Sequence, residues 1–183
     1  MLSLSGADFF GAGISGSFWF ILATLISPEK FGEIHYFLGI AGLAYGLSLI
    51  GSSDVIAVYT AKKIPLQATI SLLSLIIGAV SAIIVIILFA RIDVSFLLIV
   101  FIINDLAIGY LLGKKLFVRY SKYILTQKCL TLTLGISFYF VLGPDWIIYA
   151  LALSYVHFSI IVYKTFRSSK IDFSELKSHA GFV

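Results

Sequence analysis

The sequence predicts an all-α, multi-pass membrane protein folded as a bundle of six transmembrane helices. Hydrophobic residues make up 60% of the 183-residue chain and charged residues only 12%, whereas soluble domains are about half apolar and a quarter charged. Such a chain has too few polar side chains to cover a water-soluble globule. Six apolar windows also reach the length of about 20 residues that a helix needs to cross a bilayer.

The six windows are separated by short polar links, which make consecutive helices antiparallel neighbours. We expect residues 1–166 to form one transmembrane lobe and residues 167–183 to form a cytoplasmic tail. The first window predicts a helix that stays in the protein and is not a cleaved signal peptide, because no Lys or Arg precedes it and no cleavage site follows it. The windows cover residues 4–26, 34–61, 68–90, 94–113, 123–142 and 146–166.

The basic residues predict the orientation of the bundle in the cell membrane. Nine of them fall in the second link, the fourth link and the tail, and a tenth, Lys164, lies at the end of the sixth window next to the tail. On the opposite side there are only Lys30 and Arg91. Cytoplasmic loops carry the excess of Lys and Arg, so both termini are expected in the cytoplasm. The ten are Lys62, Lys63, Lys114, Lys115, Arg119, Lys122, Lys164, Arg167, Lys170 and Lys177.

The second window is unusually long and rich in glycine. A continuous helix over residues 34–61 would be about 42 Å long, against about 30 Å of hydrocarbon, and would have to tilt or protrude. Gly42 and Gly46 form a GxxxG pair in it, and Gly109 and Gly113 form another in the fourth window. Small residues at this spacing let helices approach closely in lipid. We expect internal helix packing there, with a lipid-facing dimer seam as the alternative.

The segment from Ile26 to Lys63 resembles a known family. It reads Ile-Ser-Pro-Glu-Lys-Phe-Gly-Glu, then an apolar run with Leu-Ile-Gly-Ser-Ser-Asp near its end. This is similar to the first hairpin of the polysaccharide flippases, the O-antigen-type lipid-linked oligosaccharide transporters of the multidrug/oligosaccharidyl-lipid/polysaccharide exporter superfamily. The stretch 173–177, Phe-Ser-Glu-Leu-Lys, resembles the lead-in to that family's second half.

The resemblance implies a fold and a function. The family has two related lobes around a central cavity, and this chain would supply the N-terminal one. It implies movement of a polyprenyl-linked oligosaccharide across the membrane by alternating access. The expected partners are the lipid bilayer, the lipid-linked glycan, and a second six-helix lobe or a second copy of the chain. The alternative is a non-transporting membrane interaction subunit or a truncated remnant of such a transporter.

Two acidic residues within spans are candidate substrate or ion contacts. A charge inside a span is costly and marks a functional interior by default. Asp105 lies in the middle of the fourth window on one stripe with Gly109 and Gly113, so it faces other helices; it either lines a cavity or is a carboxyl satisfied between packed helices. Asp54 lies about two turns before Lys62 and can reach water or pair with a basic residue.

Two further candidates are basic or titratable. Lys128 shares a face of the fifth window with Gln127 and Thr131, and either reaches the nearby interface with its ammonium group or contacts a phosphate of a lipid headgroup. His157 lies in the middle of the sixth window, where it is either hydrogen-bonded between helices or part of a proton relay.

The sequence does not indicate an enzyme. It has no HExxH motif, no Cys/His cluster and no phosphate-binding glycine loop after a strand. We therefore expect no catalytic residues, no cofactor and no metal. The positive charge fits a cytoplasmic membrane face better than nucleic acid, which we do not expect as a partner.

Overall fold

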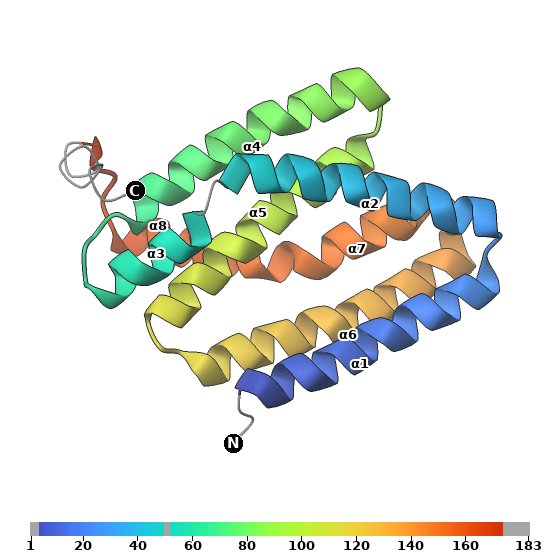
Figure 1. Cartoon of the computed structure of the whole chain (residues 1–183), viewed down its shortest axis with the longest axis horizontal. Coiled ribbons are helices and arrows are strands. Elements are labelled where there is room, and N and C mark those ends of the chain that lie inside the picture. The colour runs from blue at the N-terminus through green and yellow to red at the C-terminus, as the bar shows by residue number, and fades with distance from the viewer. Residues whose placement is uncertain (1–3, 50–51, 174–183) are drawn as a thin grey trace.

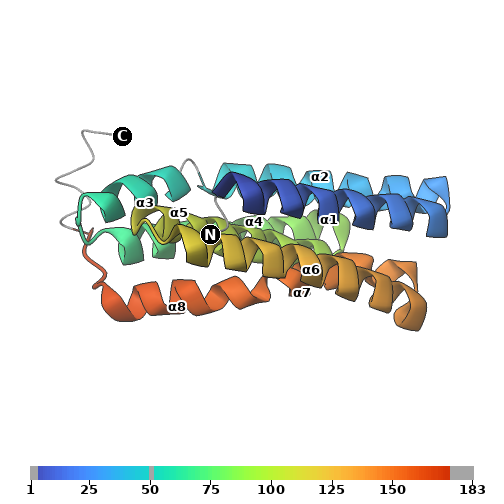
Figure 2. The ribbon, with the colours of Figure 1, turned by 90° about the horizontal axis from the view of Figure 1, so that it is seen from below.

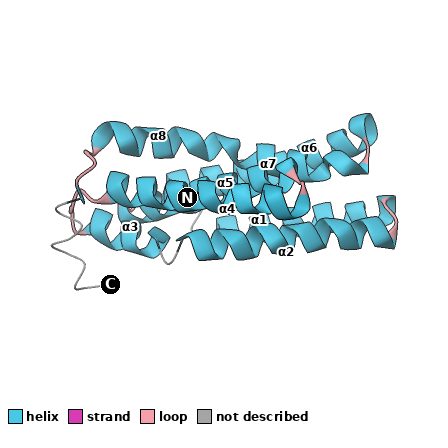
Figure 3. Cartoon of the chain, turned by 90° about the horizontal axis from the view of Figure 1, so that it is seen from above, coloured by secondary structure: helices cyan, strands magenta, loops and turns pink. Residues whose placement is uncertain are grey.

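The computed structural model describes residues 4–49 and 52–173, and every regular element within those ranges is helical (Figures 1 and 3). The elements in chain order are α1 (Leu4–Leu25), α2 (Pro28–Leu49), α3 (Ser52–Ala61), α4 (Gln67–Phe89), α5 (Ile92–Gly113), α6 (Phe117–Leu142), the 3-10 helix η1 (Pro144–Trp146), α7 (Ile147–Tyr155), the 3-10 helix η2 (Val156–Phe158) and α8 (Ser159–Ser168).

The helices confirm the expected all-α, multi-pass membrane architecture. Five described spans are long and apolar enough to cross a membrane, and α2 with α3 makes a sixth when that bent pair counts as one. The outer face of α4 shows the lipid-facing character most clearly, since its exposed side chains are almost entirely aliphatic. They include Ile76, Ile77, Val80, Ile83, Ile84, Ile87 and Leu88.

The expectation of one continuous helix over residues 34–61 is wrong. The structure has two helices, α2 and α3, bent by 42° across residues 50–51, which lie outside the described residues. With 22 residues, α2 is about 33 Å long and matches the hydrocarbon thickness of about 30 Å. The bend thus removes the excess length that would otherwise force a tilt.

The first polar link, expected over residues 27–33, is also shorter than expected, because α2 begins at Pro28 rather than at residue 34. The Ser27 hydroxyl oxygen accepts a hydrogen bond from the Lys30 amide at 3.3 Å, as an N-cap residue does. Proline at the first helical position loses nothing, since its missing N–H would have no partner there. Residues 28–33 therefore form the first turns of α2.

Two other boundaries differ from the expectation. The helix α6 begins at Phe117 instead of residue 123, so Arg119 and Lys122 lie on the helix and not in a link. The last span is interrupted at η2 between α7 and α8, and a stretch of 3-10 helix inside a span often marks a hinge. The predicted tail begins within the last turn of α8, and residues 174–183 lie outside the described residues.

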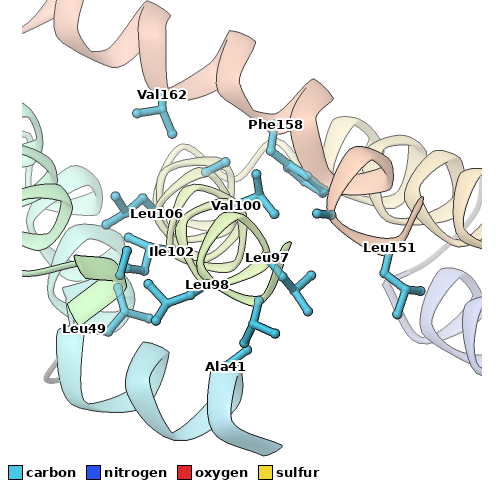
Figure 4. Packing of buried hydrophobic residues seen from close by; sticks show 14 of the residues in the cluster. Ala41, Leu49, Leu97, Leu98, Val100, Ile102, Leu106, Leu151, Phe158 and Val162 are labelled. Carbon is cyan, nitrogen blue, oxygen red and sulfur yellow. The ribbon is translucent and has the colours of Figure 1, made fainter. Parts of the chain in front are cut away.

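The helix α5 is the centre of the bundle and packs against α2, α3, α4 and α7. Figure 4 shows its buried side chains, Leu97, Leu98, Val100, Ile102 and Leu106, pointing to different neighbours. The side chain of Ile102 occupies the space that a β-carbon at residue 78 would take, so Gly78 lets α4 lie close. The core is therefore organised around one helix that lipid barely touches.

The helices α1 and α6 form a pair that stands apart from α2. The ring of Phe18 fills the space beside Gly135 of α6, and the Tyr139 hydroxyl donates a 2.7 Å hydrogen bond to the Leu25 carbonyl. α1 meets α2 mainly near their connection, where the Trp19 and His35 rings lie 4.6 Å apart. From there the two helices diverge toward their other ends, although both lie in the same layer (Figures 1 and 2).

The links gather at two opposite ends of the bundle. Lys30 pairs with Asp145, and Arg91 pairs with Glu33, at what we call the hinge end. Lys63, Lys114 and Ser168 line one pocket at the other end, which we call the basic end. This grouping is what antiparallel consecutive spans produce.

Candidate functional sites

Asp105 lies half-buried on α5 at the junction of three helices. The hydroxyl of Tyr45 on α2 is next to its carboxyl. Tyr45 and Tyr155 of α7 both pack edge-on against the ring of Phe101, with centroids 5.9 and 5.1 Å away. The carboxyl therefore has a neighbouring phenol that can donate to it when it is ionised and accept from it when it is protonated.

The residue before Asp105 has an unused acceptor. The Asn104 side-chain oxygen is buried and has no hydrogen-bond partner within the described residues. Most buried polar atoms are paired, so an exception calls for an explanation. The half-buried carboxyl of Asp105 and the buried, unpaired amide oxygen of Asn104 together make a polar point in the middle of α5.

Asp54 lies in the first turn of α3, where its side chain is exposed. Its neighbour Ser53 packs against α5, because a β-carbon at Gly109 would lie 2.5 Å from the Ser53 carbonyl oxygen. Asp54 and Asp105 thus belong to adjoining elements. No ion pair or hydrogen bond joins the two carboxyls in the described part of the chain.

Lys128 lies in the other helix pair. Its side chain is half-buried and runs along α1, with Cγ 3.3 Å from the position of a β-carbon at Gly11. It does not share a face with Gln127 and Thr131, as the sequence suggested, because those two side chains point to Ser154 on α7. Among the described residues no carboxylate pairs with the ammonium group.

His157 lies in η2 with a carbonyl oxygen within hydrogen-bond distance of each ring nitrogen, and because a carbonyl oxygen only accepts, a neutral imidazole donates to one of the two at a time. Nδ1 is 3.0 Å from the Ser154 carbonyl oxygen, and Nε2 is 3.2 Å from the Tyr123 carbonyl oxygen of α6. Its ring also stacks on the Tyr123 ring with centroids 5.2 Å apart. The geometry is that of a histidine tying two spans together at the break in the last one.

A buried polar cluster lies beside His157 between α6 and α7. The Gln127 amide donates to the Thr131 hydroxyl at 2.8 Å, and the hydroxyls of Thr131 and Ser154 are 2.9 Å apart. All three side chains are buried. The cluster and His157 hold the sixth span against α6, whereas Asp105 faces α2 and Lys128 faces α1.

A charged network lies at the hinge end and is not among the sites predicted from the sequence. Arg91 donates to both oxygens of Asp93 at 2.9 and 2.8 Å and to Glu33 at 2.9 Å. Lys30 bridges Glu33 at 2.7 Å and Asp145 at 2.5 Å. These five residues, which we call the hinge-end network, join α2, the link before α5, and η1.

Arg91 is the residue that the hinge-end network depends on most. The hydrogen bonds that Arg91 donates to the Asp93 carboxylate raise the pKa of the guanidinium, and the one that it donates to Glu33 adds to this. The guanidinium also lies 4.1 Å from the centre of the Phe37 ring, a cation–π distance. Asp93 is only 5% exposed, so without Arg91 its charge would be buried and unpaired. Opposite charges in three links of one end were the sequence signal for this network.

The two glycine pairs behave differently. At Gly109 and Gly113 a β-carbon would lie 2.5 and 2.6 Å from carbonyl oxygens of α3, so these glycines make close helix contact possible. At Gly42 and Gly46 a β-carbon would meet no described atom within 4 Å. Internal packing, the preferred interpretation of the Gly42/Gly46 pair, is therefore wrong for the described part of this chain. Gly13, Gly16 and Gly39 are open in the same way.

No known protein family, curated protein or solved structure matches this chain. Its described residues form an all-helical, multi-pass membrane protein with five to six spans. Their main polar groupings include the Asp105 junction, the α6–α7 cluster with His157, and the hinge-end network.

Proposed function

We propose that this protein is one lobe of a polysaccharide-flippase-like transporter, which moves a polyprenyl-linked oligosaccharide across the membrane by alternating access. The second lobe is another six-helix lobe or another copy of the chain. The lobe faces its counterpart with α1 and α2, and the carrier lipid stays in the bilayer while the glycan headgroup passes between the lobes. This proposal rests on the resemblance of the hairpin 26–63 to that family together with one structural observation.

The observation is the contrast between two exposed faces. The exposed face of α4 is aliphatic, as hydrocarbon requires. The exposed residues of α1 and α2 include large apolar side chains such as Phe20, Leu43 and Leu47 as well. They differ from α4 in that they also include open glycines, Gly13, Gly16, Gly39 and Gly46, and the polar groups of Ser17 and His35. A face that mixes open glycines with polar groups suits a path for a polar headgroup better than contact with lipid tails alone.

The Asp105 junction lies behind this face, where α2, α5 and α7 meet. Asp105 is our candidate for the coupling-ion or proton site, since a carboxyl beside a phenol can change protonation as the helices move. Asp54 and Lys128 are the candidate headgroup contacts, one on α3 and one beside α1. His157 is assigned to positioning of the broken sixth span.

A flipping assay tests the proposal. The purified chain is reconstituted into liposomes at several protein densities with a fluorescent polyprenyl-linked glycan, and loss of outer-leaflet label is followed in time. We expect flipping above the protein-free rate, and a loss of about 100-fold in Asp105→Asn, the lower end of the range that a positioned proton-transfer group contributes. The control is Glu29→Gln, an exposed carboxyl on the first turn of α2. Flipping at the protein-free rate at every density would refute transport by this chain with a second copy of itself as the other lobe.

The open Gly42/Gly46 pair favours a second candidate, a membrane interaction subunit that associates through a GxxxG seam on α2. Gly42→Ile would then abolish self-association in detergent without changing the fold of the monomer. If the wild-type protein is monomeric and Gly42→Ile changes nothing, this candidate fails.

A further inference from the structure

The connection between α5 and α6 carries a surface pocket at the basic end that the transport proposal does not use. Its volume is about 510 Å³. Three cationic side chains line it, Lys115, Arg119 and Lys122, together with the apolar side chains of Leu116, Phe117 and Val118. Arg119 and Lys122, three residues apart, lie on one side of the first turns of α6, and Lys115 lies in the connection just before that helix.

The three cations have no acidic partner in the described part of the chain. Every ion pair found there belongs to the hinge-end network. The acidic side chain recorded beside this turn of α6 is Asp8, which accepts a hydrogen bond from Tyr120 at 3.2 Å. The pocket therefore concentrates positive charge that the chain itself does not neutralise.

One of the three cations, Lys115, has a backbone conformation that disfavours a side chain. Lys115 has φ of 57° and ends α5, with the amides of Lys115 and Leu116 bonded to the carbonyls of Leu112 and Leu111 at 2.9 Å. Glycine is the usual residue at this left-handed position, because a β-carbon is disfavoured there. A lysine thus occupies the place where glycine would fold more easily.

The start of α6 is electrostatically unfavourable for the cations it carries. Its first turn contains no acidic residue and has Arg119 instead, and no side chain caps it. The N-terminus of a helix has a partial positive charge and free amide groups, so it favours an anion and disfavours a cation. An anion in the pocket would relieve the repulsion and would also give the cations their missing partner.

The apolar wall specifies what kind of anion fits. Phe117 is 43% exposed and Val118 54% exposed, and they begin a span that runs to Leu142. The pocket therefore lies where the apolar part of the bilayer meets its headgroups. A free inorganic anion would leave these side chains uncovered, whereas an acyl chain would cover them.

We propose that this pocket binds an anionic phospholipid of the membrane. The phosphate is held by Arg119, Lys115 and Lys122 at the start of α6, and an acyl chain lies along Phe117 and Val118. Clusters of basic residues next to a span recognise anionic lipid headgroups in this manner. The site is independent of transport and stands even if the protein moves nothing.

Native mass spectrometry of the detergent-solubilised protein tests the site. Bound lipid is counted during titration with phosphatidylglycerol or phosphatidylcholine, with and without excess inorganic phosphate. We expect preferential retention of phosphatidylglycerol, and at least about a tenfold loss of apparent affinity in K115Q/R119Q/K122Q, because each basic residue contributes separately. Inorganic phosphate alone is expected not to displace the lipid.

Two controls keep the test decisive. K62Q/K164Q/K170Q removes the same charge from exposed positions outside this pocket and should bind phosphatidylglycerol within about threefold of wild type, since it spares the site. K115R/K122R retains the charge and should bind as wild type does. The proposal is overturned if both triple variants lose affinity equally, if neither loses it, or if inorganic phosphate competes as well as the lipid.

Discussion

Gly109→Ala should destabilise the bundle, and the structure provides the magnitude. A β-carbon at residue 109 would lie 2.5 Å from the Ser53 carbonyl oxygen and 3.1 Å from its carbon atoms. A carbon normally approaches a carbonyl oxygen no closer than about 3.3 Å, so the backbone of α3 would have to move by about 0.8 Å. Overpacking of this kind costs about 1–3 kcal/mol.

The matched control is Gly42→Ala, also in the middle of a helix. No described atom lies within 4 Å of its β-carbon position, so the change adds a methyl group without a clash. Both substitutions share the helix-propensity gain of up to about 1 kcal/mol. The difference between the two variants therefore isolates the overpacking cost at the α3–α5 contact.

Thermal or denaturant unfolding in detergent measures this difference. We expect Gly42→Ala to be as stable as wild type or slightly more stable, and Gly109→Ala to be about 1–3 kcal/mol less stable than Gly42→Ala. For a chain of this size each kcal/mol corresponds to about 2–4 °C in Tm. Equal stability of the two variants would refute the packing of α3 on α5, including the bend between α2 and α3 that produces it.

Two other variants test the remaining polar contacts. Arg91→Gln removes the partner of buried Asp93 and should cost about 1.5–3 kcal/mol of unfolding free energy, the range for hydrogen bonds to charged groups. The control is Lys170→Gln, which is exposed and without an ion pair in the described residues. An equal effect of the two substitutions would exclude a stabilising hinge-end network. Ser154→Ala removes one member of the α6–α7 cluster and should cost about 0.6 kcal/mol, with an upper bound near 1.7, as hydrogen bonds between membrane helices do. A loss several times larger would mean that the cluster is not a set of ordinary interhelical bonds.

The number and approximate place of the spans could be predicted from the sequence because both depend on local composition. The start of α2 could have been predicted as well, since Ser27 followed by Pro28 is a recognisable N-cap and first helical position. The polar side chains of residues 27–33 instead favour a link between two spans, and they hide this helix signal. The bend after Leu49 also has a local signal, because the glycine, two serines and aspartate of residues 51–54 interrupt the apolar run, but the apolar residues on both sides made the window look continuous.

The contacts of the candidate sites could also be predicted only in part from the sequence. Spacing could place Asp105 on one stripe with Gly109, but could not show that Tyr45 is its neighbour, because that contact joins two helices far apart in the chain. Spacing likewise could not distinguish Gly42 from Gly109, which occur in identical GxxxG patterns. Only the tertiary arrangement decides which pair meets a backbone and which remains open.

The central claim is that the open face of α1 and α2 is a path for a polar headgroup and not a lipid-facing surface. Cysteine accessibility in the native membrane tests it most directly. On a Cys129→Ser background, single cysteines replace Gly16, Gly42 and, on the aliphatic face of α4, Ile83, and a membrane-impermeant maleimide is added to membrane vesicles of each orientation. Maleimides react with the thiolate, which forms only in contact with water. The account predicts labelling at residues 16 and 42 from one side and none at residue 83; equal protection of all three positions would contradict it.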